Sequence, residues 1–139
     1  MGEKKAEVRL SRIVLVEGHE QQFIQLREAR PATDPPRELT MVIGPVEARE
    51  IRRCLEGEGT PRPLTHELAF RILKTLQVKV REAVIHDLRG GTFFAELRID
   101  HDGSVIGVDC RPSDAIALSL RGSTPVFVTD QVFEAAKSP

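Results

Sequence analysis

The residues best suited to chemistry lie in the segment Asp109–Asp114, where a predicted strand ends and a helix begins. Backbone N–H groups at a helix start attract anions, and the guanidinium of Arg111 adds donors suited to phosphate or carboxylate. Asp109 and Asp114 also suit a divalent cation, because hard cations take carboxylate oxygens. In the structural alternative, Ser113 and Asp114 cap the helix and Asp109 pairs with Arg111 inside the protein. The segment therefore predicts either a phosphate and metal site or a set of internal contacts.

A second helix start, Arg62–Glu67, carries the same residue types. Arg62 is followed by proline and a hydroxyl residue, and His66 is the one histidine placed for general acid or base catalysis, because imidazole titrates near neutrality. Consecutive residues of a helix point about 100° apart, so His66 and Glu67 need not converge on one ligand. A capping or surface histidine is the alternative interpretation.

Several sharper motifs are absent from the sequence. His66-Glu67 is not followed by the second histidine of a zinc protease, and Ser113 lies in neither a GxSxG elbow nor an SxxK motif. There is also no Walker loop and no GxGxxG fingerprint. Hydrolysis by those protease and esterase mechanisms is therefore unsupported.

The charge balance argues against a broad nucleic-acid-binding face. Twenty basic residues against twenty-one acidic ones give a formal net charge of −1, whereas binding along a polyphosphate backbone is typical of a basic domain or stripe. Tryptophan and tyrosine are absent, and six phenylalanines are the only aromatic residues. Any phosphate site is therefore expected to be local, with a few arginines in a cleft.

A length of 139 residues predicts one domain, spanning the whole chain with a core at about residues 8–136. Cys54 and Cys110 lie far apart without a Cys/His cluster, which excludes a zinc finger and favours a reduced cytosolic setting. No apolar run is long enough for a membrane span, and the charged amino terminus is unlike a signal peptide. We expect a cytoplasmic protein that has no membrane partner.

Periodicity predicts an α+β fold with mixed or antiparallel sheets and about four helices. The last strand is expected at an edge of the sheet. The helix that begins after Pro63 has apolar residues at every fourth position from Leu64 to Leu76, and this stripe is expected to be buried. The predicted strands are Glu7–Val16, Gln22–Ala29, Leu39–Ile43, Val78–Leu88, Thr92–Ile99, Val105–Cys110 and Pro125–Val128, and the predicted helices are Pro45–Leu55, Leu64–Leu76, Pro112–Leu120 and Asp130–Ala136.

The sequence contains a weak internal repeat. When the sequence is aligned with itself at an offset of 71 residues, Ile13 aligns with Val84 and Phe23 aligns with Phe94. With the loop shortened, Gly44–Glu47 aligns with Arg111–Asp114 as a strand exit followed by a proline-led helix. These matches indicate a duplicated strand–strand–strand–helix unit, with Arg62–Leu76 inserted between the copies. Chance similarity of two amphipathic hairpins is the alternative.

Three segments resemble the bifunctional nuclease domain family, and the resemblance spans about Val8–Ala136. They are Arg62–Leu68 (RPLTHEL), Gly91–Ala95 (GTFFA) and Asp109–Leu118 (DCRPSDAIAL). The resemblance implies an α+β domain that degrades both DNA and RNA. The sequence departs from the family pattern in three residues: Glu67 replaces aspartate, Cys110 replaces alanine and Phe94 replaces tyrosine.

The leading hypothesis is therefore a nuclease that is assisted by a divalent metal. Asp109, Asp114 and Glu67 would hold Mg²⁺ or Mn²⁺, and the metal would activate water. The substrate-binding set would be Arg62, Arg111 and Ser113, with the two arginines on the scissile phosphate, and the catalytic set would be His66, Asp109 and Asp114, with His66 available for proton transfer.

Two further interpretations stay open. A non-catalytic regulatory or assembly module would use the same arginine-rich helix starts to bind an anionic ligand or a protein partner, and a purely structural interpretation makes Arg111 and Asp114 an internal pair. The apolar run Ile13–Val16 also favours a homo-oligomer, because it would leave an apolar face for a second copy.

Overall fold

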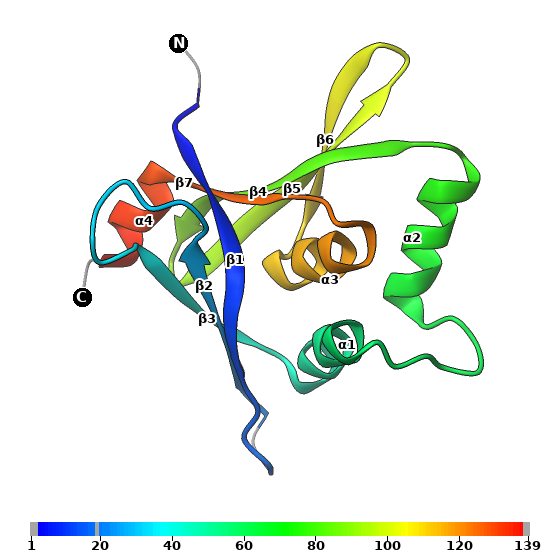
Figure 1. Ribbon diagram of the computed structural model, residues 1–139, viewed down its shortest axis with the longest axis horizontal. Coiled ribbons are helices and arrows are strands. Elements are labelled where there is room, and N and C mark those ends of the chain that lie inside the picture. Colours follow the sequence, from blue (N-terminus) through cyan, green and yellow to red (C-terminus); the bar gives the residue numbers. More distant parts are fainter. Residues whose placement is uncertain (1–2, 19, 138–139) are drawn as a thin grey trace.

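The computed structural model describes residues 3–18 and 20–137, which form a single α+β domain. Seven strands make one mixed sheet in the order β3-β2-β1-β7-β4-β5-β6, as Figure 1 shows. The strands are β1 (Lys5–Val14), β2 (Gln22–Glu28), β3 (Glu38–Ile43), β4 (Lys79–Arg89), β5 (Thr92–His101), β6 (Ser104–Cys110) and β7 (Val126–Thr129), and the helices are α1 (Pro45–Glu56), α2 (Thr65–Thr75), α3 (Pro112–Gly122) and α4 (Asp130–Lys137). This architecture confirms the predicted fold class.

The same order of elements occurs twice along the chain. Strands β1, β2 and β3 form an antiparallel meander followed by α1, and β4, β5 and β6 form another followed by α3. We call these the first and second units. Helix α2 lies between them, as the sequence repeat predicts.

Strand β7 joins the two units, and here the sequence prediction of an edge strand is wrong. The strand lies in the middle of the sheet, antiparallel to β1 and parallel to β4. Val126 and Val128 are both buried. Pro125 precedes the strand and therefore removes no ladder donor from it, and its carbonyl accepts a hydrogen bond from the N–H of Ala83.

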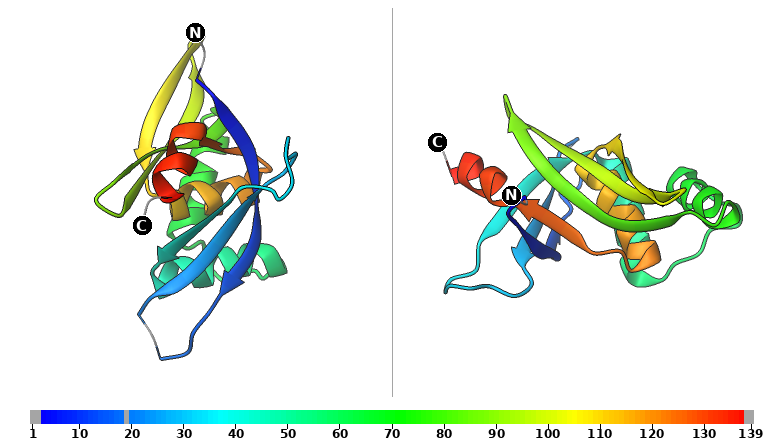
Figure 2. Two further views of the ribbon diagram at one scale, coloured as in Figure 1. Left: turned by 90° about the vertical axis from the view of Figure 1, so that its left-hand side faces the viewer. Right: turned by 90° about the horizontal axis from the view of Figure 1, so that it is seen from above.

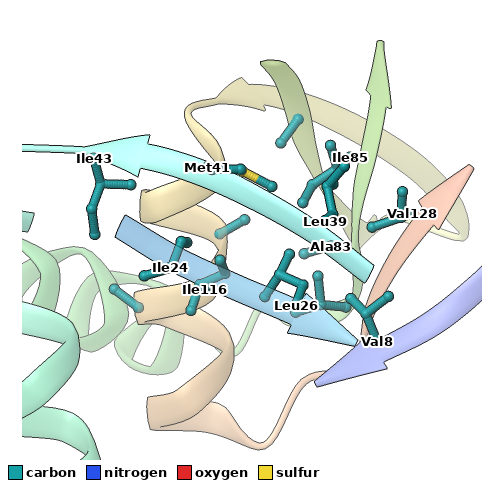
Figure 3. Packing of buried hydrophobic residues seen from close by; sticks show 14 of the residues in the cluster. Val8, Ile24, Leu26, Leu39, Met41, Ile43, Ala83, Ile85, Ile116 and Val128 are labelled. Atoms are coloured by element: carbon teal, nitrogen blue, oxygen red, sulfur yellow. The ribbon is translucent and has the colours of Figure 1, made fainter. Parts of the chain in front are cut away.

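The sheet is strongly curved around α3. In Figure 1 the strands of the first unit run steeply down the picture while β4 and β7 run across it, and Figure 2 shows β4 and β5 bending past α3, with α2 and α4 at opposite ends of the molecule. Six residues of α3 are buried, and four of them are alanine or serine, whose small side chains allow close packing on several sides. Figure 3 shows Ile116 of α3 facing Ile24 and Leu26 of β2. This enclosure fixes the position of the first turn of α3.

Helix α2 differs from its prediction in one respect. Its boundaries agree with the expected helix, but none of its residues is buried. It packs mainly on α3, and the stripe of Leu64, Leu68, Ile72 and Leu76 faces outward. Apolar periodicity identifies one face of a helix but does not say what covers that face.

None of the helices in the described residues is long and apolar enough to cross a membrane.

Candidate functional site

The first turn of α3 is built around an arginine and an aspartate. Arg111 has an extended backbone at the helix start, and Pro112 occupies the first helical position, where no N–H donor is needed. The Asp114 carboxylate accepts hydrogen bonds from the backbone N–H of Arg111 at 3.1 Å and from its side-chain Nε and Nη2 at 3.0 and 2.8 Å. The guanidinium is thereby held in one orientation by two parallel bonds.

His66 from α2 completes this cluster across 48 residues of sequence. Its Nε2 lies 2.8 Å from Oδ1 of Asp114. Burial raises the pKa of the Asp114 carboxyl, but the hydrogen bonds from His66 and Arg111 outweigh burial, and the net pKa lies well below its usual value. The carboxylate is therefore ionised at neutral pH and accepts a hydrogen bond from Nε2 of His66. Three of the predicted site residues thus meet at one point.

A cavity of about 510 Å³ opens beside Arg111, and we call it the N-terminal cavity because the first turns of α1 and α3 both border it. The side chain of Arg111 is 60% exposed, and its Nη1 lies 3.7 Å from Oε1 of Glu47 on α1. Helix amino termini carry partial positive charge, so both helices favour an anion here. The lining residues are Thr40, Met41, Val42, Ile43, Gly44, Glu47, Gly91, Thr92, Phe93, Arg111, Pro112 and Ser113.

Glu47 is a lining residue that the sequence reasoning assigned only to the helix start. Its carboxylate folds back over Gly44, where an added Cβ would stand 2.2 Å from Oε1. The repeat contained the signal needed to find it, because Gly44–Glu47 aligns with Arg111–Asp114. Phe93 and Thr92, from the GTFFA segment, were also missed as lining residues and bring an aromatic ring and a hydroxyl to the same cavity.

The other predicted site residues lie elsewhere. Cys110 packs against the core, and because strand residues alternate between faces, Asp109 points to the opposite face of the sheet, beside Glu96 in the register. Glu67 turns away from His66 and pairs with Arg71 at 2.8 Å. Arg62 is exposed and is not among the residues that line the N-terminal cavity.

The carboxylates predicted to hold Mg²⁺ or Mn²⁺ therefore do not form a fitting donor set. Asp109 and Asp114 are directed to different faces, and both oxygens of Asp114 already accept hydrogen bonds. Within residues 3–18 and 20–137, no group of three or more histidine, cysteine, aspartate or glutamate side chains is arranged to hold a metal ion.

The opposite end of α3 borders a larger cavity of about 750 Å³, the C-terminal cavity, in which Arg53, Arg71 and Arg121 each pair with a carboxylate. The carboxylate of Glu50, which is 2% exposed, pairs with Arg53 at 2.8 Å and with Arg121. Glu67 also lies here, beside Arg71. The side chains of Arg53 and Arg121 are only 24% and 20% exposed, whereas that of Arg111 is 60% exposed, so Arg111 is the better anchor for a ligand.

Cys110 is not a nucleophile in this arrangement. Burial, reinforced by the charges of Asp114 and Asp109, raises the pKa of its thiol to about 12. The thiolate, which is the reactive form, is therefore scarce at neutral pH.

Comparison with known proteins gives two findings. Residues 26–139 match the family described as bifunctional nuclease domain, and this range covers both predicted helix starts, Arg62–Glu67 and Arg111–Asp114. Two uncharacterized proteins of Mycobacterium tuberculosis, from strains CDC 1551 and H37Rv, are each 37% identical over 130 residues, covering 94% of this chain and 75% of the relative.

Proposed function

Because the chain belongs to the bifunctional nuclease domain family, we propose that it is a nuclease that hydrolyses phosphodiester bonds of DNA and RNA in the N-terminal cavity. The observation that carries this proposal is the exposed guanidinium of Arg111 between two helix amino termini. The family supports a nuclease-type role, and the geometry supplies a place for one phosphate.

Phosphate binding is the role of Arg111. Asp114 holds Nε and Nη2 of its guanidinium, which leaves Nη1 on the cavity side for a phosphate oxygen. The helix amino termini add favourable dipoles without adding net charge. A single local anchor of this kind agrees with an overall net charge of −1.

Glu47 is the residue we assign to activation of water. It is the carboxylate that lines the N-terminal cavity, close to the guanidinium that would hold the phosphate. Water would attack phosphorus and pass its proton to Glu47, while the bond from phosphorus to the leaving sugar oxygen breaks and that oxygen takes a proton from solvent. The negative charge that develops on the phosphate would be stabilised by Arg111.

His66 is a positioning residue in this scheme. It does not line the cavity, and it acts through its hydrogen bond to Asp114, which in turn orients Arg111. His66 fixes the orientation of the Asp114 carboxylate, and this carboxylate fixes the orientation of the Arg111 guanidinium.

The experiment is cleavage of defined single- and double-stranded DNA and RNA oligonucleotides by the wild type, Glu47→Gln and Asp109→Ala. We expect Glu47→Gln to lose at least tenfold in kcat and Asp109→Ala, on the outer face, to stay within twofold. Parallel reactions with Mg²⁺, Mn²⁺ or chelator test the metal predicted from the sequence. Loss of activity in Asp109→Ala together with loss in chelator would restore the metal hypothesis and contradict the assignment of Glu47 as the general base.

A second function is favoured by one observation. The cavity is lined mainly by hydroxyl and apolar groups, including Phe93, and its size suits a small ligand held by one charged contact. A non-catalytic module that binds a nucleotide or organic anion would be stabilised against heat by mononucleotides and would turn over none of the oligonucleotides. Cleavage that Glu47→Gln abolishes would exclude this alternative.

A further inference from the structure

The outward face of α2 carries an apolar stripe that nothing in the described structure covers. Its four members, Leu64, Leu68, Ile72 and Leu76, are 41%, 52%, 49% and 68% exposed. At 100° per residue, Thr65 and Thr75 fall within the same arc of the helix surface and no charged residue does. Four large side chains in this state amount to a patch on the order of 400 Å², the size of the largest apolar patches on soluble monomers.

We propose that this stripe is the interface with a second copy of the chain, in which the two α2 helices pack antiparallel across a twofold axis. The four apolar residues are placed symmetrically about position 70, so reversing the helix superposes the stripe on itself. Leu64 then faces Leu76 of the second copy, and Leu68 faces Ile72. A surface that complements itself in this way is what a twofold dimer requires.

The available area supports a dimer. A standard interface covers about 800 Å² on each partner, and slightly more than half of that area is apolar. The stripe supplies most of this apolar share, and the threonines within it and Arg71 at its border supply polar surface. Because the stripe follows every fourth residue, it forms the type of ridge that packs at a crossing angle of about −50°.

Charge complementarity favours the antiparallel direction. Along one border of the stripe, Glu67 lies in the amino-terminal half of α2, and Arg71 and Lys74 lie in the carboxy-terminal half. An antiparallel twofold pair places this border of one helix beside the same border of the other, with each glutamate toward the cations of the second copy, whereas a parallel twofold pair places the two borders on opposite sides of the seam, where these charges do not meet.

A second copy would also hold the helix that carries His66. An isolated helix of eleven residues is marginal in water, and α2 has no buried residue and packs mainly against α3. A second copy that covers the outer face of α2 would therefore stabilise the helix and, with it, the contact between His66 and Asp114 on its inner face.

The test is sedimentation velocity over a range of protein concentrations. We expect a dimer for the wild type, and monomers for Leu68→Glu and for Ile72→Lys, each of which puts a charge into the seam without disturbing the monomer core. Mixing these two variants should restore a dimer, because antiparallel packing places the introduced carboxylate of one copy opposite the introduced ammonium of the other. The shorter side chain in Leu68→Ala should raise the dissociation constant at least tenfold without introducing a charge.

The matched control is Leu55→Glu on α1, where a leucine of similar exposure, 49%, lies outside the stripe. This variant should stay dimeric, and amide hydrogen exchange in α2 should be at least tenfold faster in the monomeric variants than in the control. A monomeric wild type, a dimeric Leu68→Glu, an unchanged dissociation constant in Leu68→Ala, or folded variants that fail to reassociate would overturn the proposal. A monomer that binds vesicles of anionic lipid through the stripe would also overturn it.

Discussion

The two units of the sheet end in helix starts that face the same cavity with different chemistry. In the first unit, Gly44 precedes the proline and Glu47 is the acidic residue. This unit therefore lines the cavity with the backbone of a glycine and with a carboxylate. In the second unit, Arg111 and Asp114 occupy the matching positions, so the cavity receives a guanidinium. One backbone plan, used twice, can therefore place a phosphate anchor and a carboxylate beside each other in one site.

The helix inserted between the units increases this asymmetry. His66 of α2 contacts Asp114, the acidic residue of the second unit, and makes no such contact with Glu47 of the first unit. We therefore expect substitutions in the second helix start to cost more than those in the first.

The largest effect is expected at Arg111. Arg111→Ala should lower kcat/KM for oligonucleotide cleavage by about 100-fold, because the donor that stabilises charge on the phosphate is lost. Arg62→Ala is the matched control, since Arg62 is exposed and lies outside the lining of the cavity, and it should remain within twofold. Equal losses in both variants would show that the arginines act through general charge and not through this site.

Comparison of the two acidic residues should show the next largest effect. Asp114→Asn is expected to lower the free energy of unfolding by about 2 kcal/mol, since it weakens charge-assisted bonds to Arg111 and His66, and Glu47→Gln by less than about 1 kcal/mol, since its ion pair is long. Urea denaturation of both variants measures this difference, and a larger loss in Glu47→Gln would reverse the ranking of the two units.

The pH dependence of the same measurement has a defined sign. Because the pKa of Asp114 is lowered in the folded state, its contribution to stability is complete above its unfolded value of about 3.9 and is lost as the pH falls below that value. The difference in the free energy of unfolding between the wild type and Asp114→Asn should therefore decrease progressively below about pH 4. A difference that increases below about pH 4 would contradict the assigned contacts of the Asp114 carboxylate with Arg111 and His66.

A smaller effect is expected from Gly44→Ala in the first unit. The added Cβ would stand 2.2 Å from Oε1 of Glu47, so the carboxylate has to move. We expect about a tenfold loss of kcat, the cost of misplacing one general base. Gly59→Ala, where no heavy atom lies within 4 Å, is the control and should retain full activity. Loss of activity in the Gly59 variant alone would point away from the N-terminal cavity.

The smallest effect is expected at Cys110, the counterpart of Ile43 at the end of the first meander. Cys110→Ala should change activity less than twofold, because burial raises the pKa of the thiol to about 12 and leaves it unreactive. Iodoacetamide should modify it far more slowly in the folded protein than in urea at pH 8. Rapid inactivation by the reagent at this residue would contradict the structural role.

Local signals in the sequence predict much of this fold. Proline at the first helical position placed both α1 and α3, and Gly57, with a left-handed φ of 68°, ends α1 as expected. Periodicity predicts a buried stripe on α2, but periodicity shows only which residues share a face and not whether another element covers that face. The central place of β7 depends on pairing with β1 and β4 across most of the chain, which no local pattern contains.

Only part of the site could be predicted, because some of its contacts join segments that are far apart in the sequence. Helix geometry does not require His66 and Glu67 to converge, and the structure separates them, since the first contacts Asp114 and the second contacts Arg71. Strand alternation could have separated Asp109 from the α3 side, because its neighbour in the strand faces the core. The approach of α1 to Arg111 joins two units far apart in sequence and needs the curvature of the whole sheet.

Binding of a phosphate in the N-terminal cavity, between the two helix starts, can be observed by an NMR titration of backbone amides with a dinucleoside monophosphate. We expect shifts concentrated at the amides of Val46 and Ser113, which follow Pro45 and Pro112 and carry the first N–H groups of α1 and α3, and we expect these shifts to disappear in Arg111→Ala. Shifts confined to the C-terminal cavity around Arg121, or the same shifts in Arg111→Ala, would contradict phosphate binding at this site.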